Sequence, residues 1–351
     1  MIPITDILPS ALLEDINAGL SANKNKTTKL ANMFFGEPVF DPSDKILYET
    51  TGNREERTSH IYKYGSPLKP LTKSGKSYLE YDMLNIGDGY IVDEKEYKRF
   101  KDFYINIANT DDFNQWLTKE SIKLMMEMSN RIDNQIENIA RSLILDQKVV
   151  WDGEDYLQFD IPVANNKGAV SISSKDMIYY LDDQKTFLRD EYGIVDNNFV
   201  LAVGQGAFEK LRADAGVNAE LTSYATYRSN AGQIPTEQSI FGLDYYGNEL
   251  KYLPNIDLPI MVVQGKLKVK KVDTVFGTDD WRLLPQNFGE HKFKGANVAT
   301  DTTIGKVNDL YTFARSLHEE GKRYNLQVFQ ETFRALYPKN PNSLIKGTFT
   351  A

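Results

Sequence analysis

The residues best suited to bind a phosphate group lie in two short glycine-containing segments. Residues 70–77, Pro-Leu-Thr-Lys-Ser-Gly-Lys-Ser, match a phosphate-binding P-loop except at the first position, where proline replaces glycine. A P-loop opens a helix, whereas residues 77–84 alternate as a strand does. Gly204-Gln-Gly206 follows an apolar run but lacks the third glycine of a dinucleotide-binding turn. We therefore expect a hairpin tip at the first segment and a strand-to-helix turn at the second, and a nucleotide-binding enzyme is the less favoured alternative.

Side chains that support nucleophilic or metal chemistry are few and scattered. The chain has no cysteine, and its three histidines, His60, His291 and His318, stand far apart in sequence. This excludes a thiol nucleophile, a zinc-thiolate cluster and a local two-histidine metal clamp. The acidic runs at 152–155 and 279–280 are typical of turns. We expect His291 and His318 at the surface and predict no catalytic residue, no metal ligand and no cofactor.

The composition is that of a folded protein with an acidic surface. Of 351 residues, 41% are hydrophobic, and 41 basic residues face 49 acidic ones, for a net charge of -8. Such a charge repels the phosphate backbone of nucleic acids and anionic lipids, so sequence-specific DNA binding is not expected. The first ten residues lack the pattern of a signal peptide, and no apolar run is long enough for a membrane helix. We expect a protein made in the cytoplasm without membrane contact.

The elements that must position these residues change in character along the chain. Residues 1–40 resemble an arm with little core of its own, and 45–92 predict an extended, charged hairpin. Residues 111–146 contain neither glycine nor proline and predict one long helix. Its apolar stripe, expected to face a sheet, includes Met128, Ile132, Ile136, Ile139 and Leu143.

The second half of the chain mixes strands and helices. A hairpin is expected over 148–163, a helix over 173–192, a buried strand over 198–203 and a short helix over 207–213. Short strands dominate 224–300. Two terminal strands over 325–349 are interrupted by Pro338 and Pro341.

Taken in order, these elements resemble the major capsid protein of tailed bacteriophages, the Johnson fold, and in particular the lambda-like major head protein family. Each local match covers only a few residues, but their order and spacing extend over most of the chain. The matching segments are Asp44–Tyr62, Ser66-Pro67 and Gly75–Tyr81 for the family's extended loop; Glu137–Ala140 and Val149–Gly153 for the end of the spine helix and the following hairpin; Asn198–Leu211 and Leu284–Asn287 for the axial domain; and Gln327–Phe349 for the closing segment.

The resemblance implies an α+β fold in five segments. These are an N-terminal arm (1–40), an extended loop with flanking strands (41–100), a peripheral domain with the spine helix (101–195), an axial domain (196–322) and return strands of the peripheral domain (323–351). Some relatives crosslink lysine to asparagine between loops. Lys63, Lys69, Lys73 and Lys76 are available here, but the lambda-like branch is not known for this chemistry, so none is assigned.

The resemblance also implies a non-enzymatic function. The chain would self-assemble as pentamers and hexamers into an icosahedral shell around double-stranded DNA, with scaffold, portal and decoration proteins as partners. It would be assembled in the cytoplasm of a bacterial host and reside in the virion capsid. A cellular container or a gene transfer particle built on the same fold is the alternative.

Overall fold

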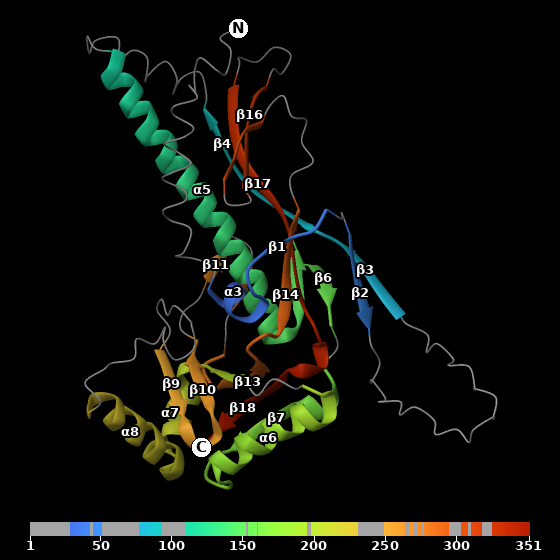
Figure 1. Cartoon of the computed structure of the whole chain (residues 1–351), viewed down its shortest axis with the longest axis vertical. Coiled ribbons are helices and arrows are strands. Elements are labelled where there is room, and N and C mark those ends of the chain that lie inside the picture. Colours follow the sequence, from blue (N-terminus) through green and yellow to red (C-terminus); the bar gives the residue numbers. More distant parts are fainter. Residues whose placement is uncertain are drawn as a thin grey trace, which may run out of the picture.

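The computed structural model describes residues 29–42, 45–50, 77–92, 110–151, 154–159, 161–194, 198–230, 249–263, 267–269, 272–274, 277–294, 303–307, 310–317 and 325–351. One long helix and two six-stranded sheets organise these residues along the long axis of the molecule (Figure 1). We call the two sheets the long sheet and the compact sheet.

The long helix is α5, Thr110–Asp146, and its 37 residues form one continuous element, as the sequence predicts. All five residues predicted for its inner stripe are buried: Met128, Ile132, Ile136, Ile139 and Leu143. The next residue, Gln147, is fully buried and has a φ of 52°. A residue in this left-handed conformation ends a helix. The side chain of Gln147 donates a hydrogen bond to the carbonyl oxygen of Pro341.

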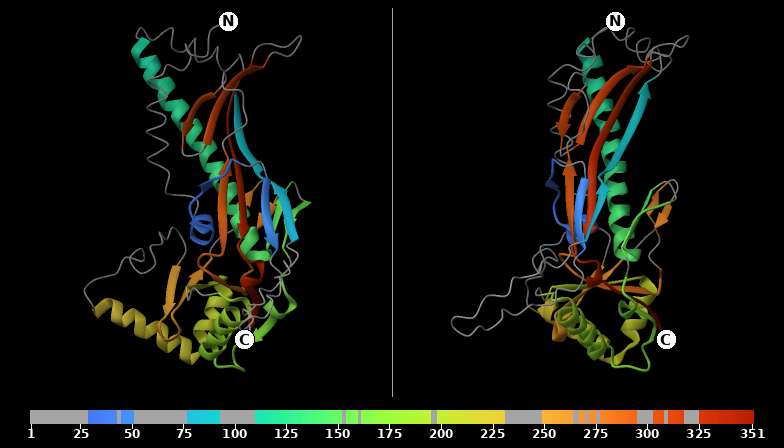
Figure 2. Two further views of the ribbon diagram at one scale, coloured as in Figure 1. Left: turned by 45° about the vertical axis from the view of Figure 1, so that its right-hand side comes forward. Right: turned by 90° about the vertical axis from the view of Figure 1, so that its right-hand side faces the viewer.

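The long sheet lies beside α5 and has β17 as its central strand (Figure 2). β17 is antiparallel to three strands, and it is long enough to pair with β16 and β4 along one half and β14 along the other. The sheet order is β1-β14-β17-β16-β15, with β4 also on β17. Its strands are β1 (Val39–Phe40), β4 (Leu84–Val92), β14 (Gly289–Lys294), β15 (Thr303–Val307), β16 (Leu310–Leu317) and β17 (Asn325–Pro338).

The central strands of the compact sheet, β8 and β10, are buried on both faces. Phe199, Leu201 and Val203 of β8 pack with the helices α6, α7 and α8, whereas Val200 and Ala202 belong to the cluster around α5. This alternation places one core on each side of the sheet. The order is β7-β18-β13-β8-β10-β9. The elements are β7 (Asn166–Ser171), β8 (Phe199–Val203), β9 (Glu249–Leu253), β10 (Leu258–Val262), β13 (Asp280–Pro285), β18 (Ile345–Thr350), α6 (Met177–Tyr192), α7 (Gln205–Ala213) and α8 (Ala215–Asn230).

Three hairpins complete the described strands. β2 (Lys45–Thr50) pairs with β3 (Ser77–Asp82) and projects from the body in Figure 1. The expected hairpin over 45–92 is therefore shorter than predicted, because residues 84–92 form β4 and join the long sheet. The other pairs are β5 (Lys148–Trp151) with β6 (Glu154–Gln158), and β11 (Leu267–Val269) with β12 (Val272–Thr274).

The strands of each sheet come from distant parts of the chain. β7 and β18 belong to the compact sheet, whereas β14, β15 and β16 lie in the long sheet with β17. The division into five segments stays a prediction. No helix within the described ranges is long and apolar enough to span a membrane.

Candidate functional site

The turn at Gly204 is closed by backbone and has no room for a phosphate group. Gly204 precedes α7, and a side chain there would lie 2.2 Å from the carbonyl oxygen of Gly277. At the same corner, the amide of Ala207 donates to the carbonyl of Thr278 at 2.7 Å. A dinucleotide site needs these amides free to bind a pyrophosphate. The glycine is present because two backbone segments meet at this corner.

The acidic run at 279–280 forms ion pairs within the fold. Asp279 lies 2.9 Å from the ammonium of Lys210, and Asp280 lies 3.6 Å from the guanidinium of Arg282. Across the parts of the chain that the structure covers, no group of three acidic or histidine side chains is arranged to hold a metal ion. Of the other sequence candidates, residues 70–76 and 152–153, His60, His318 and the four lysines from Lys63 to Lys76 lie outside the described residues. Ser77 begins strand β3, so a strand follows the P-loop-like segment, as predicted.

The prediction for His291 was wrong, because this residue is buried at 3% exposure. The even residues of β14 are partly exposed, whereas Gly289, His291 and Phe293 are buried. Burial and the charge of Arg334 lower the pKa of His291 to about 3, although the Gly36 backbone opposes the shift. His291 is therefore neutral at ordinary pH and belongs to the core.

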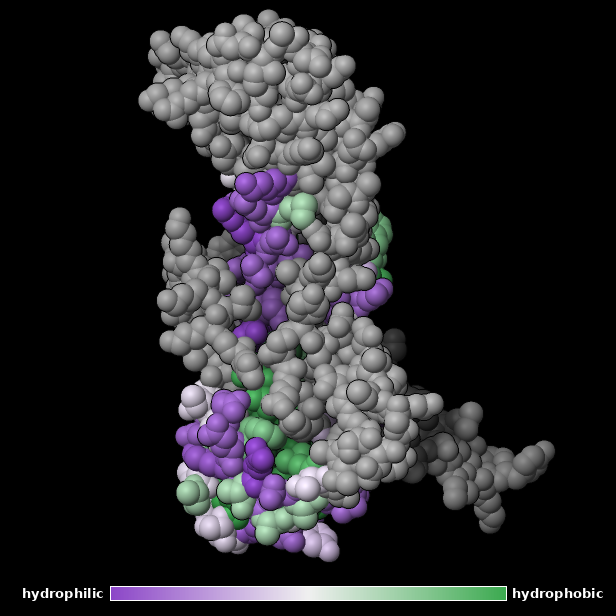
Figure 3. Space-filling view, turned by 90° about the vertical axis from the view of Figure 1, so that its left-hand side faces the viewer, coloured by the Kyte–Doolittle hydropathy of each residue, from purple (hydrophilic) through white to green (hydrophobic). Residues whose placement is uncertain are grey.

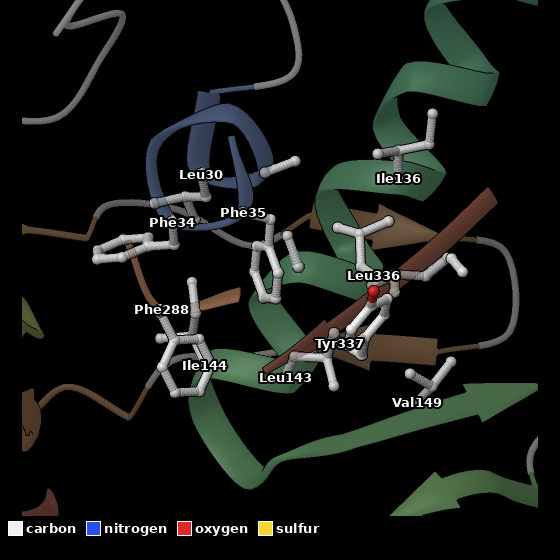
Figure 4. Close-up of a cluster of buried hydrophobic side chains, with 14 of the residues drawn as sticks. Leu30, Phe34, Phe35, Ile136, Leu143, Ile144, Val149, Phe288, Leu336 and Tyr337 are labelled. Carbon is white, nitrogen blue, oxygen red and sulfur yellow. The ribbon is translucent and has the colours of Figure 1, made fainter. Parts of the chain in front are cut away.

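The segment before β1 is also more integrated than the expected arm. Helix α3, Lys29–Phe35, packs on α5 and β14, and Phe34 and Phe35 are buried beside Phe288 (Figure 4). Its first amides, Leu30 and Ala31, donate to the buried carboxylate of Glu137 at 3.0 and 3.3 Å. A carboxylate at the start of a helix satisfies amides that have no partner within the helix. The first 28 residues lie outside the described chain.

Arg282 connects the compact sheet to the end of α5 by a side-chain hydrogen bond. Its Nε donates to the carbonyl of Leu145 at 3.0 Å, and its Nη1 donates to the carbonyl of Trp281 at 2.9 Å. Leu145 lies in the last turn of α5, where carbonyls lack helical partners and carry partial negative charge. Burial lowers the pKa of Arg282, while the carboxylates of Asp280 and Asp146 oppose this. The contact therefore joins the helix to the sheet within the core.

Two proline-containing turns lie side by side where the chain passes between the sheets. η1, Val163–Asn165, precedes β7, and η4, Pro341–Ser343, precedes β18. The fully buried Asn165 joins them, since its Nδ2 donates to the carbonyls of Asn342 and Leu344 at 2.6 and 3.0 Å. Its Oδ1 accepts from the hydroxyl of Tyr192 at 2.8 Å. We call these two turns, residues 161–166 and 340–345, the Val163 platform. Sequence reasoning missed it, although the proline spacing and the absence of charge were visible signals.

Large apolar side chains are exposed at four described positions. They are Val39 at 63%, Phe40 at 56%, Val163 at 92% and Tyr179 at 73%. Elsewhere, hydrophilic residues line the described outer side of α5, and both kinds mix over the compact sheet's helices (Figure 3). These exposed side chains lie on β1, η1 and α6, whereas Arg282 and its acceptor Leu145 form a buried joint between the compact sheet and α5.

Comparison with known proteins identifies the fold. No protein-family model and no curated protein matches the sequence. A crystal structure described as a prophage capsid protein from Escherichia coli CFT073 aligns with 97% of this chain and 98% of its own, at 16% identity and a TM-score of 0.59. A phage-related protein from Bordetella bronchiseptica RB50 aligns over 95% of both chains, at 10% identity and a TM-score of 0.43. A virus-like particle protein from Pyrococcus furiosus aligns over 98% of this chain and 99% of its own, at 9% identity and a TM-score of 0.40.

The first of these alignments covers nearly the whole of both chains, so the similarity is not confined to one part of this chain. The α+β capsid fold implied by the sequence resemblance is confirmed: this chain has the fold of the prophage capsid protein.

Proposed function

We propose that this chain is a major capsid protein that assembles with copies of itself into a closed shell. The observation that carries the proposal is the match with the prophage capsid protein over 97% of this chain and 98% of that protein. Two further features support a function in association: the hairpin β2–β3 projects from the body, and several large apolar residues are exposed.

In finer detail, pentamers and hexamers would tile an icosahedral head around double-stranded DNA. The five expected segments would act as arm, extended loop, peripheral domain, axial domain and return strands. The net charge of -8 supports a shell that holds DNA without adhering to it. Scaffold, portal and decoration proteins would be further partners, assembly would occur in the cytoplasm of a bacterial host, and the chain would catalyse no reaction.

The test is to express the chain alone and examine it by negative-stain microscopy and sedimentation. We expect closed shells or ring-shaped capsomers at high protein concentration. A protein that sediments as a monomer at every concentration, with or without co-expressed neighbouring genes, would contradict the proposal.

A further inference from the structure

Val163 is the most exposed of the large apolar residues described, and the turn that carries it is held by hydrogen bonds of the buried Asn165. Its side chain is 92% exposed, although the residue two positions later, Asn165, is fully buried. The turn closes through a bond from the Asn165 amide to the Pro162 carbonyl at 2.9 Å. Asn165 then holds the turn to η4 and to α6 through its side-chain bonds. An apolar group held in this way loses little conformational entropy when a partner covers it.

The neighbouring turn is fixed by independent contacts. The amide of Asn342 donates to Asn340 Oδ1 at 3.0 Å, and the hydroxyl of Ser343 donates to the Asn340 carbonyl at 2.6 Å. Gln147, from the end of α5, donates to the carbonyl of Pro341. Both turns are therefore preorganised by buried polar side chains from several elements.

The platform is also free of charge. Residues 161–166, Ile-Pro-Val-Ala-Asn-Asn, and 340–345, Asn-Pro-Asn-Ser-Leu-Ile, contain no ionisable side chain, in a chain that is 26% charged. Charged residues occur only at the flanks, at 160, 167, 339 and 346. Depletion of charge around an apolar centre is the composition of an interface core, and it disfavours nucleic acid as the partner.

We propose that the accessible part of the Val163 platform, residues 161–164 and 166 with 340–342, is a contact surface between copies of this chain, supported from beneath by the buried residues Asn165 and 343–345. This inference rests on the proposed function, because a shell subunit must bury such surfaces against its own kind. A second copy also offers a separate exposed apolar patch, Val39 and Phe40 on the edge strand β1. Two different apolar patches on one chain permit a head-to-tail contact, the type that closes rings.

Tyr179 provides a matched control. It is 73% exposed on α6, but Asp176, Asp182 and Asp183 on the same helix are exposed as well. A surface with this much charge lacks the neutral centre that marks the platform, so Tyr179 is expected to stay accessible in the assembly.

Because the chain has no cysteine, a single introduced thiol reports on one position. Val163→Cys and Tyr179→Cys are each treated with a maleimide, as dilute subunits and as purified assemblies. We expect assembly to slow the labelling of Val163→Cys by about tenfold or more, since water is excluded from the centre of an interface. Labelling of Tyr179→Cys should stay within about twofold between the two states.

A second pair of variants tests function directly. Val163→Glu should fold, with unchanged circular dichroism, but fail to assemble, whereas Tyr179→Glu should assemble like the parent. If parent shells form and Val163→Cys labels equally fast in both states, or Val163→Glu assembles normally, the inference is wrong and the proposed function stands. Protection that requires a different added protein also overturns it. A parent protein that never assembles overturns both.

Discussion

Arg282 links the compact sheet to the last turn of α5 through a hydrogen bond from its buried guanidinium. It reaches the Leu145 carbonyl from β13 and lies close to Asp280 on its own strand. Replacing a buried cation with an apolar side chain leaves those acceptors without a donor inside the protein. The stability of the joint should therefore depend on this residue more than on any surface ion pair.

We expect Arg282→Met, which keeps much of the side-chain volume, to lower the free energy of unfolding by about 3–5 kcal/mol. The measurement is urea denaturation of subunits kept too dilute to assemble. Arg212→Met, at an exposed position of α7, is the matched control and should change stability by less than about 0.5 kcal/mol. Equal effects in the two variants would show that the Arg282 contacts contribute nothing special.

His291 should make the subunit sensitive to acid. Its pKa is about 3 in the folded chain, below the ordinary value of 6.5 expected after unfolding. Between these values the unfolded chain binds a proton that the folded chain does not, so stability falls as the pH is lowered through 6.5 toward 3. The slope from one such group approaches about 1.4 kcal/mol per pH unit.

The check is the unfolding free energy of the parent and of His291→Leu between pH 7.5 and 4.5. We expect a shallower slope in the variant, whatever its stability at pH 7.5, because carboxylate titrations are common to both proteins. Parallel curves would mean that His291 titrates normally.

At the residue scale, sequence reasoning succeeded where local pattern decides burial. The strand at 199–203 is apolar at every position and is buried at every position. His291 was misplaced because β14, Gly-Glu-His-Lys-Phe-Lys, carries a polar residue on its buried face. Helix α3, which is far away in the sequence, packs against β14 and helps to bury it. Val163 was overlooked because the burial of Asn165, two positions later, depends on partners at 342 and 344, far along the chain.

At the element scale, α5 is buried on one face around residue 132 and on nearly all sides from residue 136 to residue 145. Ile136 is 2% exposed and lies in the cluster with Leu143 and Leu336, whereas Asn134 is exposed. A carboxylate at Ile136 would be buried without a partner, at a cost of several kcal/mol. The same helix thus contains a test position and a control two residues apart.

Ile136→Asp should lose about 3–5 kcal/mol of unfolding free energy, or fail to give soluble protein. Asn134→Asp should stay within about 0.5 kcal/mol of the parent. Thermal melts of both variants at neutral pH measure the difference. A soluble Ile136→Asp protein that melts within a degree or two of the parent would mean that the buried face has been misassigned.

The helix itself was predictable because its apolar residues recur every three or four positions, a pattern that is visible within neighbouring turns. Its bounds of 110–146 match the expected 111–146. The sheets were less accessible to sequence reasoning. β4 pairs with β17 across more than two hundred residues, and β18 leaves β17 to pair with β13 and β7 in the other sheet. Such pairings are set by the topology of the whole chain. α3 was interpreted as part of an arm because its partner Glu137 lies 107 residues away.

At the scale of the whole molecule, the joint and the exposed surfaces have complementary roles. The compact sheet is held to α5 by Arg282 and by apolar packing of Met261 and Leu284. The described surface also carries the projecting hairpin β2–β3 and the exposed side chains of Val39, Phe40 and Val163. A rigid body with several separate contact regions can bind several neighbours at once, which is what a closed lattice requires.

The assembly should therefore be weak pairwise and stable as a whole. Each contact region is small, so isolated pairs are expected to dissociate at micromolar or higher concentrations, whereas a subunit in a shell must break several contacts together to leave. Dilution series followed by light scattering, for capsomers and for shells, should show prompt dissociation of the former and persistence of the latter. In parallel, screens for hydrolysis of nucleotides, esters and glycosides should give no turnover. Tight, concentration-independent dimers, or a turnover abolished by one polar substitution in monomeric protein, would contradict a function that depends on association alone.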